Sequence, residues 1–297
     1  PDAKPHPSPV VESAAMASIE SPDITYKPKL PKELIESGAI SEVQLEAVVY
    51  AGQAHEKFLP PDVDTGIEYR QGWMDGDGTG MGKGRTIAAV ILDNFNHGRR
   101  KAVWVSKNTS LLKDSREYWS ALGQNEAQII DFGKIPLGKK IEHKDGVMFV
   151  TYGQLKQLGK GDKAGQSRLQ QLADWLGPDF DGALIFDEAH LMSGAAPSRG
   201  SRGVTRPPAQ GLAGLEFQRQ MPKARVGYFT ATSATEVQHL AYAERLGLWG
   251  RGTEFANRSD FVAKIVDAGV AAMELVSRDL KALGKYLARS LSYAGVK

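Results

Sequence analysis

Four short apolar runs that alternate with helix-like segments place the strongest limit on the fold of this 297-residue chain. The runs lie at residues 102–106, 147–151, 183–186 and 226–231, and helical spacing occurs at residues 111–122, 168–176 and 212–220. Continuous apolar runs with β-branched residues are typical of parallel strands buried on both faces of a sheet. Because strands and helices alternate, we expect an α/β fold in which helices sandwich a mostly parallel sheet.

The two ends of the chain show different patterns. Seven of the 15 prolines lie within the first 31 residues, and proline favours extended backbone. We therefore expect an extended arm at residues 1–30, with one short helix at 10–19. Further helices are predicted at residues 32–37, 41–55, 259–268, 269–283 and 285–291, with Ser41 as the N-cap of the second. The predicted organisation is an arm (1–30), a lobe (31–250, with helices in 31–58 and motifs in 67–235) and a helical extension (251–297).

A glycine-rich loop at residues 76–85 separates a strand-like run (67–74) from a helix-like run (86–92). Glycines allow successive backbone N–H groups to converge on an anion, and the helix adds the positive end of its dipole. Lys83 would reach the β- and γ-phosphates of a nucleotide. The position after the lysine, which is usually Ser or Thr, is Gly84. The loop predicts nucleotide binding; a plain flexible turn is the alternative, and a dinucleotide loop would leave Lys83 without a role.

Two carboxylates, Asp187 and Glu188, directly follow the apolar run at residues 183–186. The carboxyl ends of parallel strands are where open α/β sheets bind ligands. In P-loop NTPases an Asp at this place organises Mg²⁺ and a following Glu orients the attacking water. A solvated strand end is the alternative, but the order of this pair after Lys83 favours catalysis. His190 either couples the site to a neighbouring element or simply begins a helix.

Composition excludes several classes of protein. The chain has no cysteine, so disulfides and thiolate metal sites are excluded. A net charge of +2 does not by itself indicate nucleic-acid binding, and no apolar run approaches the roughly 18 residues of a membrane span. We expect a cytoplasmic location, with nucleoid or nucleus also open, and no membrane partner. The chain begins without Met, so a fragment or a processed form is expected.

Several motifs resemble those of superfamily 2 helicases. Residues 187–190 read Asp-Glu-Ala-His, the DEAH form of motif II, and residues 230–235 are similar to motif III. Residues 103–107 and 150–152 are similar to motifs Ia and Ib, and Gln44 resembles the adenine-reading glutamine of the Q-motif. The Gly-Lys-Gly-Arg loop and residues 180–182, 240–250 and 288–293 more narrowly resemble the strawberry notch family. This resemblance runs from about residue 10 to the end of the chain.

The resemblance implies a RecA-like P-loop NTPase domain that binds ATP and Mg²⁺. The implied nucleotide-binding residues are Gln44, Gly78, Thr79, Gly80, Met81, Gly82, Lys83, Gly84, Arg85 and Thr86. Lys83, Asp187 and Glu188 are the implied catalytic residues, and Asp187 the magnesium ligand. The family's loop also carries Gly after the lysine, so the metal-binding hydroxyl would come from Thr86 or Thr79, or be replaced by water. His190, Thr230 and Thr232 are the implied coupling residues.

Nucleic-acid contacts and a second lobe follow from the same resemblance. The residues that match motifs Ia and Ib are Ser106, Lys107, Thr151 and Tyr152. Residues 193–214 carry Arg199, Arg202 and Arg206 without an acid, which predicts a mobile loop that touches nucleic acid or a second lobe, or a solvated insertion. We expect DNA rather than RNA as the polymer.

The resemblance therefore predicts the ATP-binding first motor lobe of a helicase or translocase, which works with a second RecA-like lobe that supplies arginines to the transferring phosphoryl group. A scaffold with a vestigial ATP site and a small-molecule P-loop kinase are the alternatives.

Overall fold

A seven-stranded sheet, in which every strand pair is parallel, forms the centre of the computed structural model. The structure describes residues 2–193, 198–200, 203–205, 209–231 and 240–292. Across the sheet the strands are β10 (Tyr286–Leu287), β2 (Trp73–Asp75), β9 (Arg225–Phe229), β6 (Ala183–Phe186), β3 (Lys101–Ser106), β5 (Gly146–Thr151) and β4 (Ile129–Asp131). The expected α/β fold is confirmed.

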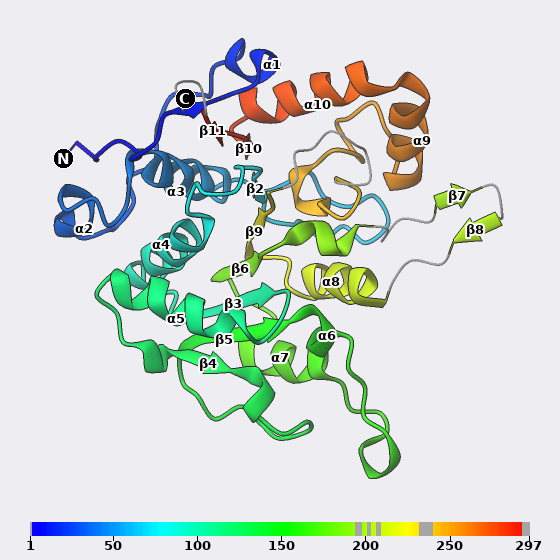
Figure 1. The fold of residues 1–297 in the computed structure, drawn as a ribbon. Helices are drawn as coiled ribbons and strands as arrows, with labels where there is room; N and C mark the ends of the chain where they lie inside the picture. Colours follow the sequence, from blue (N-terminus) through cyan, green and yellow to red (C-terminus); the bar gives the residue numbers. More distant parts are fainter. Residues whose placement is uncertain (1, 194–197, 201–202, 206–208, 232–239, 293–297) are drawn as a thin grey trace.

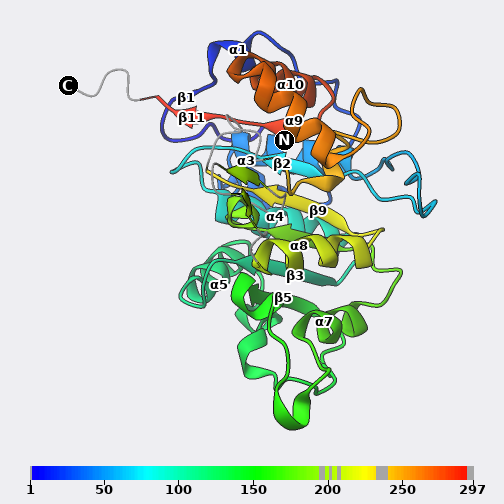
Figure 2. The same ribbon diagram turned by 90° about the vertical axis from the view of Figure 1, so that its right-hand side faces the viewer.

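Helices cover both faces of the sheet (Figure 1). One face carries α3 (Glu42–Ala54), α4 (Lys83–Asn96) and α5 (Leu111–Ala121). The other carries α6 (Tyr152–Leu155), α7 (Arg168–Leu176) and α8 (Ala209–Gln220), and Figure 2 shows α7 and α8 in front of the strands. Each face has its own cluster of buried apolar side chains, because the central strands are buried on both sides.

Local sequence signals explain where several helices begin. Ser41 and Gln44 form a capping box at the start of α3, in which each side chain bonds the backbone N–H of the other residue. The Ser167 side chain accepts from the backbone of Gln170 at the start of α7. The Asn257 side chain does the same for α9 (Arg258–Ala268). The predicted N-cap at Ser41 is thus present.

The C-terminal segment differs from its prediction. Residues 285–291 were expected to be helical, but α10 (Val270–Ala282) ends before Gly284, whose φ is +73°. That left-handed conformation turns the chain, and β10 then joins the edge of the sheet beside β2. The short strand β11 (Ser290–Leu291) follows it. The expectation of a helix was therefore wrong for these residues.

The N-terminal arm packs against this C-terminal segment. Strand β1 (Val10–Val11) pairs antiparallel with β11, and α1 (Ala14–Ala17) is shorter than the helix expected at residues 10–19. The ammonium group of Lys281 in α10 is buried, and it donates to Glu12 at 2.7 Å and to the Met16 carbonyl at 2.8 Å. Strands β1 and β11, near the two ends of the chain, consequently lie side by side (Figure 1).

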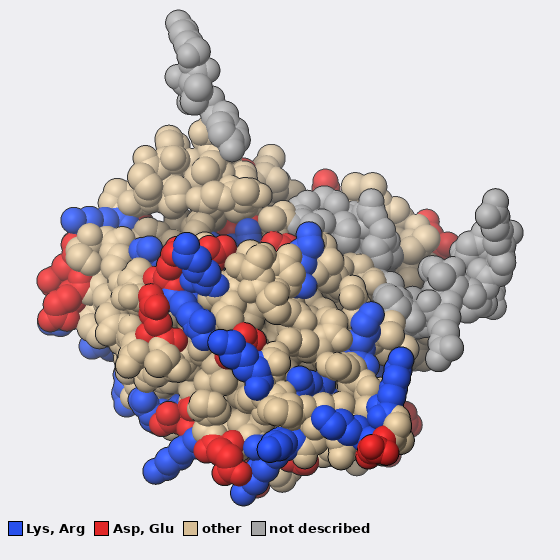
Figure 3. Space-filling model, turned by 60° about the horizontal axis from the view of Figure 1, so that its bottom comes forward, with Lys and Arg blue, Asp and Glu red and all other residues tan. Residues whose placement is uncertain are grey.

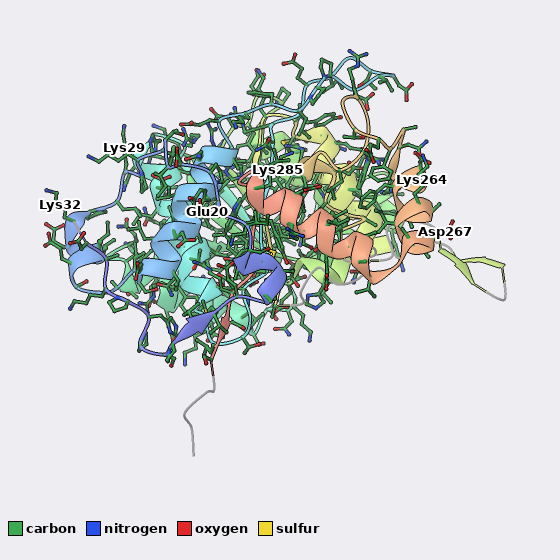
Figure 4. All side chains as sticks on the ribbon, turned by 90° about the horizontal axis from the view of Figure 1, so that it is seen from above. Glu20, Lys29, Lys32, Lys264, Asp267 and Lys285 are labelled. Carbon is green, nitrogen blue, oxygen red and sulfur yellow. The ribbon has the colours of Figure 1, made fainter. Side chains whose placement is uncertain are left out.

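The remaining elements lie at the periphery. Helix α2 (Lys32–Glu36) follows the arm, and β7 (Ser198–Gly200) and β8 (Gly203–Thr205) form an antiparallel pair that projects from the body (Figure 1). Seen from above, α10 crosses the top of the molecule, and Lys264 and Asp267 of α9 point outward (Figure 4). Within the described residues, no helix is both long and apolar enough to cross a membrane.

Candidate nucleotide site

The glycine loop connects the end of β2 to the start of α4. Gly82 is the N-cap of α4 with φ +78°, and Gly80 has φ +88°, so both adopt conformations that L side chains rarely take. The ammonium group of Lys83 donates to the carbonyl oxygens of Asp77 at 2.9 Å and Gly78 at 3.4 Å. The lysine and the helix N-terminus therefore face the same loop, the arrangement that binds phosphate.

Gln44 holds the outer side of this loop. Its amide nitrogen lies 3.4 Å from the Met81 carbonyl oxygen and 3.3 Å from that of Gly82. Its amide oxygen accepts from the backbone N–H of Ser41 at 3.0 Å. Arg85 similarly donates to the Ala39 carbonyl at 2.9 Å. These contacts fix the loop against the start of α3, and adenine recognition by Gln44 stays a prediction.

The acid pair lies at the same edge of the sheet. Asp187 follows β6, and only β9 separates β6 from β2, so the carboxylate and the glycine loop follow parallel strands that lie one strand apart in the sheet. One carboxylate oxygen of Asp187 accepts from the Glu188 backbone N–H at 2.9 Å. The other has only long contacts, with the Ser106 hydroxyl at 3.3 Å and the Trp104 indole at 3.4 Å.

The electrostatics of Asp187 are compatible with a cation ligand. Burial, and to a smaller extent the charge of Glu188, raises the pKa of Asp187 from 3.8 to about 6. A nearby cation would stabilise the ionised form of such a carboxylate, and the oxygen that makes only long hydrogen bonds is free to contact it. Mg²⁺ is usually held by one or two carboxylates together with phosphate oxygens and water. Asp187 fits that donor set, whereas no group of three or more acidic or His residues in the described chain could hold a metal alone.

A chain of polar contacts leads from the acid pair to the next strand. Nδ1 of His190 lies 2.9 Å from the Thr230 hydroxyl, which directly follows β9. The same nitrogen lies 3.4 Å from a carboxylate oxygen of Glu188. Glu188 is the one described non-glycine residue with positive φ, at 49°, a conformation that suits a functional position. The structure thus brings together two of the three predicted coupling residues, and Thr232 lies outside the described residues.

A model of the family described as "P-loop containing NTP hydrolase pore-1" matches residues 5–297. The chain belongs to this family. Strawberry notch homolog 1 of Gallus gallus is 42% identical over 298 residues, which cover 98% of this chain and 23% of that protein. Strawberry notch of Drosophila melanogaster is 42% identical over 301 residues, covering 99% of this chain and 18% of that protein. The predicted strawberry notch relationship is confirmed, and the chain spans less than a quarter of these relatives.

Among solved structures, the SWI2/SNF2 ATPase core of Sulfolobus solfataricus in complex with dsDNA matches with a TM-score of 0.54. The match covers 91% of this chain and 47% of that one, at 14% identity. At this identity the likeness concerns the fold, and it confirms the predicted RecA-like architecture.

Three side chains expected at nucleic acid are turned into the protein instead. Ser106 is fully buried beside Asp187, and the Tyr152 hydroxyl donates to the Asp187 carbonyl at 2.7 Å. Thr151 is buried and caps α6 in a capping box with Gln154. Direct contact with a polymer is therefore not supported for these three in this conformation, because they support the acid pair and its neighbouring helix.

Lys107, by contrast, is exposed at the end of β3 and can reach a ligand. Of the three loop arginines, only the backbone of Arg199 is described, in β7, while Arg202 and Arg206 lie outside the described residues. Nucleic-acid contact by these four basic residues stays a prediction.

A buried ion pair beneath the loop was not predicted. Arg289 donates to both carboxylate oxygens of Asp77, at 3.0 and 2.7 Å, and also to the Val43 carbonyl at 2.9 Å. Burial, together with the charge of Asp77, holds the pKa of the neighbouring Asp75 well above its usual value. The only signal in the sequence was two acids bordering the glycine loop, and nothing in the sequence paired them with an arginine 212 residues away.

Proposed function

We propose that this chain is the ATP-binding first motor lobe of a nucleic-acid-dependent ATPase of the helicase or translocase type. The observation that carries the proposal is the contact of His190 with Thr230, 2.9 Å apart. It joins the acid pair to the segment after the neighbouring strand, at the sheet edge where the Lys83 loop also lies. A simple ATP-binding domain has no need of this link, whereas a motor must transmit the state of the nucleotide to its polymer.

In the proposed mechanism Lys83 and the N–H groups of the loop bind the β- and γ-phosphates. Asp187 would hold Mg²⁺, and that ion would supply charge neutralisation at the phosphates. Glu188 accepts the proton of the attacking water as that water's oxygen bonds to the γ-phosphorus and the bond to the β-phosphate oxygen breaks, releasing ADP and phosphate. His190 contacts both Glu188 and Thr230, so a change in the protonation of Glu188 alters the contact of His190 with Thr230.

Efficient turnover requires a second RecA-like lobe. An arginine finger supplied from such a lobe contributes about 10³–10⁵ in rate. The chain spans only part of its relatives, and its described residues form one parallel sheet and thus one lobe. We therefore propose that this chain binds ATP and hydrolyses it slowly until the second lobe closes on the site.

The decisive experiment measures ATP turnover by the full-length protein without polymer, with DNA and with RNA. We expect stimulation by a polymer, stronger with DNA, and its loss in Lys83→Ala. Lys264→Ala is the matched control, since Lys264 is an exposed lysine that points outward from α9 (Figure 4). Absence of polymer-stimulated turnover in the wild-type protein would overturn the proposal.

A scaffold with a vestigial ATP site is the second candidate. It is favoured by the bonds of Lys83 to the loop carbonyls and by the missing hydroxyl at Gly84. Titration of this chain with ATP and Mg²⁺ separates the two, because binding that depends on Lys83 contradicts a vestigial site.

Lys107, which is exposed at the end of β3, is a candidate contact for the nucleic-acid backbone. On the face shown in Figure 3, Lys and Arg side chains alternate with acidic ones, and no continuous basic area marks a track. We propose that Lys107 makes a backbone contact, which is sequence-independent and salt-sensitive. Lys107→Ala in the full-length protein should weaken DNA binding uniformly across sequences and lower its salt dependence.

A further inference from the structure

The space beside Gly84 is filled by an aromatic ring. A Cβ atom at residue 84 would lie 2.1 Å from Cε2 of Tyr118, 2.6 Å from Cδ2 and 2.7 Å from Cζ. Real Cβ atoms do not approach other atoms so closely. A Ser or Thr at this position, as in the usual phosphate loop, is therefore excluded as long as the ring of Tyr118 stays in place.

The hydroxyl of Tyr118 lies close to where the missing hydroxyl would be. Tyr118 belongs to α5, and its ring lies against Gly84 in the first turn of α4. The phenolic oxygen is one covalent bond beyond Cζ, so it borders the place that a serine side chain would occupy. Within the described part of the chain this hydroxyl has no hydrogen-bond partner, and the residue is partly exposed.

The surroundings of this hydroxyl keep it protonated. Partial burial, followed by the charges of Asp114 and Asp187, raises the pKa of Tyr118 above its usual value. Tyr118 is thus a neutral O–H donor at physiological pH. The charge of Asp187, the carboxylate that fits Mg²⁺, is thus among those that act on Tyr118.

The two threonines expected to replace the hydroxyl are less suited. Thr86 is buried, and its hydroxyl donates to the Gly82 carbonyl within α4 at 3.4 Å. Thr79 is exposed in the loop, three residues before the helix cap. Neither occupies the place beside Gly84 that Tyr118 fills.

We propose that Tyr118 is a phosphate-binding residue whose hydroxyl donates to a phosphate oxygen of the bound nucleotide, in place of the side chain that Gly84 lacks. Gly84 and Tyr118 then act together. Gly84 has no side chain, so the ring of Tyr118 fits beside it, and the ring carries the hydroxyl that a serine at residue 84 would otherwise supply. The inference rests on the proposed function, in that the loop binds a nucleoside triphosphate.

The first test is calorimetric titration of this chain with adenylyl imidodiphosphate, a non-hydrolysable ATP analogue. Tyr118→Phe keeps the ring and removes the hydroxyl, and it should weaken binding about tenfold or more, the size of a hydrogen bond to a charged group. A phosphate contact predicts this loss both with Mg²⁺ and with EDTA. Loss confined to the Mg²⁺ titration would assign the hydroxyl to the metal's coordination sphere and overturn the phosphate contact. Glu117→Gln, an exposed neighbour on α5, is the control and should bind as wild type does.

A swap of the two side chains gives a second, independent test. Gly84→Ser alone should weaken binding because the new Cβ meets the ring. Tyr118→Ala should also weaken binding, because it removes the hydroxyl. The double variant Tyr118→Ala with Gly84→Ser should recover most of the affinity, because the smaller alanine leaves space for the serine and the serine supplies a hydroxyl. If the double variant is folded, as its melting temperature will show, and binds the analogue no more tightly than either single variant, the joint role of Gly84 and Tyr118 is overturned.

The same titrations separate this inference from the proposed function. If wild-type protein binds no nucleotide and Lys83→Ala changes nothing, the proposed function fails. If binding depends on Lys83 but Tyr118→Phe binds as wild type does, only the role of Tyr118 is overturned.

Discussion

Asp187, for which we propose a role in the site, is costly to the fold when it is ionised. Its side chain is enclosed at the end of β6, and its pKa of about 6 lies above the ordinary 3.8. The folded protein therefore binds more protons than the unfolded chain between these two values, so the contribution of Asp187 to stability is present below pH 4 and is lost as the pH rises through 6. A cation at this carboxylate would offset the loss.

We expect Asp187→Asn to stabilise the ligand-free protein at pH 8 by about 1–2 kcal/mol, because the variant has no charge to bury. The gain should shrink as the pH falls below 6, where the wild-type carboxyl is itself protonated. Urea unfolding of both proteins at pH 5 and pH 8 measures it. A variant that is less stable than wild type at pH 8 would show that the carboxylate contributes more through its hydrogen bonds than it costs through burial.

At the scale of elements, the contact between the ends of β6 and β9 has a separable role. Thr230→Val keeps the shape of the side chain and removes the hydrogen bond to His190. We expect nucleotide affinity to persist, while stimulation of ATP turnover by nucleic acid falls several-fold in the full-length protein. Thr230→Ser should restore the stimulation. Equal loss of basal and stimulated rates in Thr230→Val would place Thr230 in hydrolysis rather than coupling.

Elements with strong local signals could be predicted, and those that depend on distant partners could not. The buried strands β3, β5 and β6, the capping box of Ser41 and the glycine loop before α4 are all set by neighbouring residues. By contrast β10 has two residues and no periodicity. Its pairing with β2 depends on packing between segments far apart in the chain.

The candidate site divides in the same way. Lys83, Asp187 and His190 lie in recognisable motifs, and the sequence located them. Ser106 and Tyr152, in contrast, turn inward and form hydrogen bonds with Asp187. The contact of Tyr118 with Gly84 results from the packing of α5 on α4. The spacing of residues along the chain does not predict either contact, because both form between different elements.

At the scale of the whole molecule, His55 makes stability depend on pH. The imidazole is fully buried, lies 2.8 Å from the Val226 carbonyl, and has a pKa lowered from 6.5 to about 3 by burial. The unfolded chain therefore takes up a proton below pH 6.5 that the folded protein refuses, so stability falls as the pH drops from 6.5 toward 3.

We expect the His55 contribution to lower the free energy of unfolding by about 3 kcal/mol between pH 6.5 and pH 4. His55→Gln can still donate to the Val226 carbonyl, but it does not titrate, so its unfolding free energy should change less over this range. Chemical denaturation of both proteins across the range tests this. Parallel curves would show that His55 is not responsible.

The buried pair of Asp77 and Arg289 fastens the glycine loop to the C-terminal segment. Arg289→Met leaves the Asp77 carboxylate without its cation, and removal of one partner of a buried pair typically costs about 3–5 kcal/mol. We expect a fall of this size in the free energy of unfolding, and faster proteolysis near residue 284. Arg251→Met, which changes an exposed arginine, should have neither effect. A variant as stable as wild type would show that β10 holds the segment without the ion pair.

The pairing of β10 with β2 also has a consequence for the order in which the protein is made. A ribosome adds about 5–20 residues per second, so the 212 residues between Asp77 and Arg289 take about 10–40 s to synthesise. During that time β2 lacks its neighbour β10, and the glycine loop that we propose binds ATP lacks its bonds to Arg289. The glycine loop of the nascent chain therefore lacks the support of β10 and Arg289 until the segment that carries them has been synthesised.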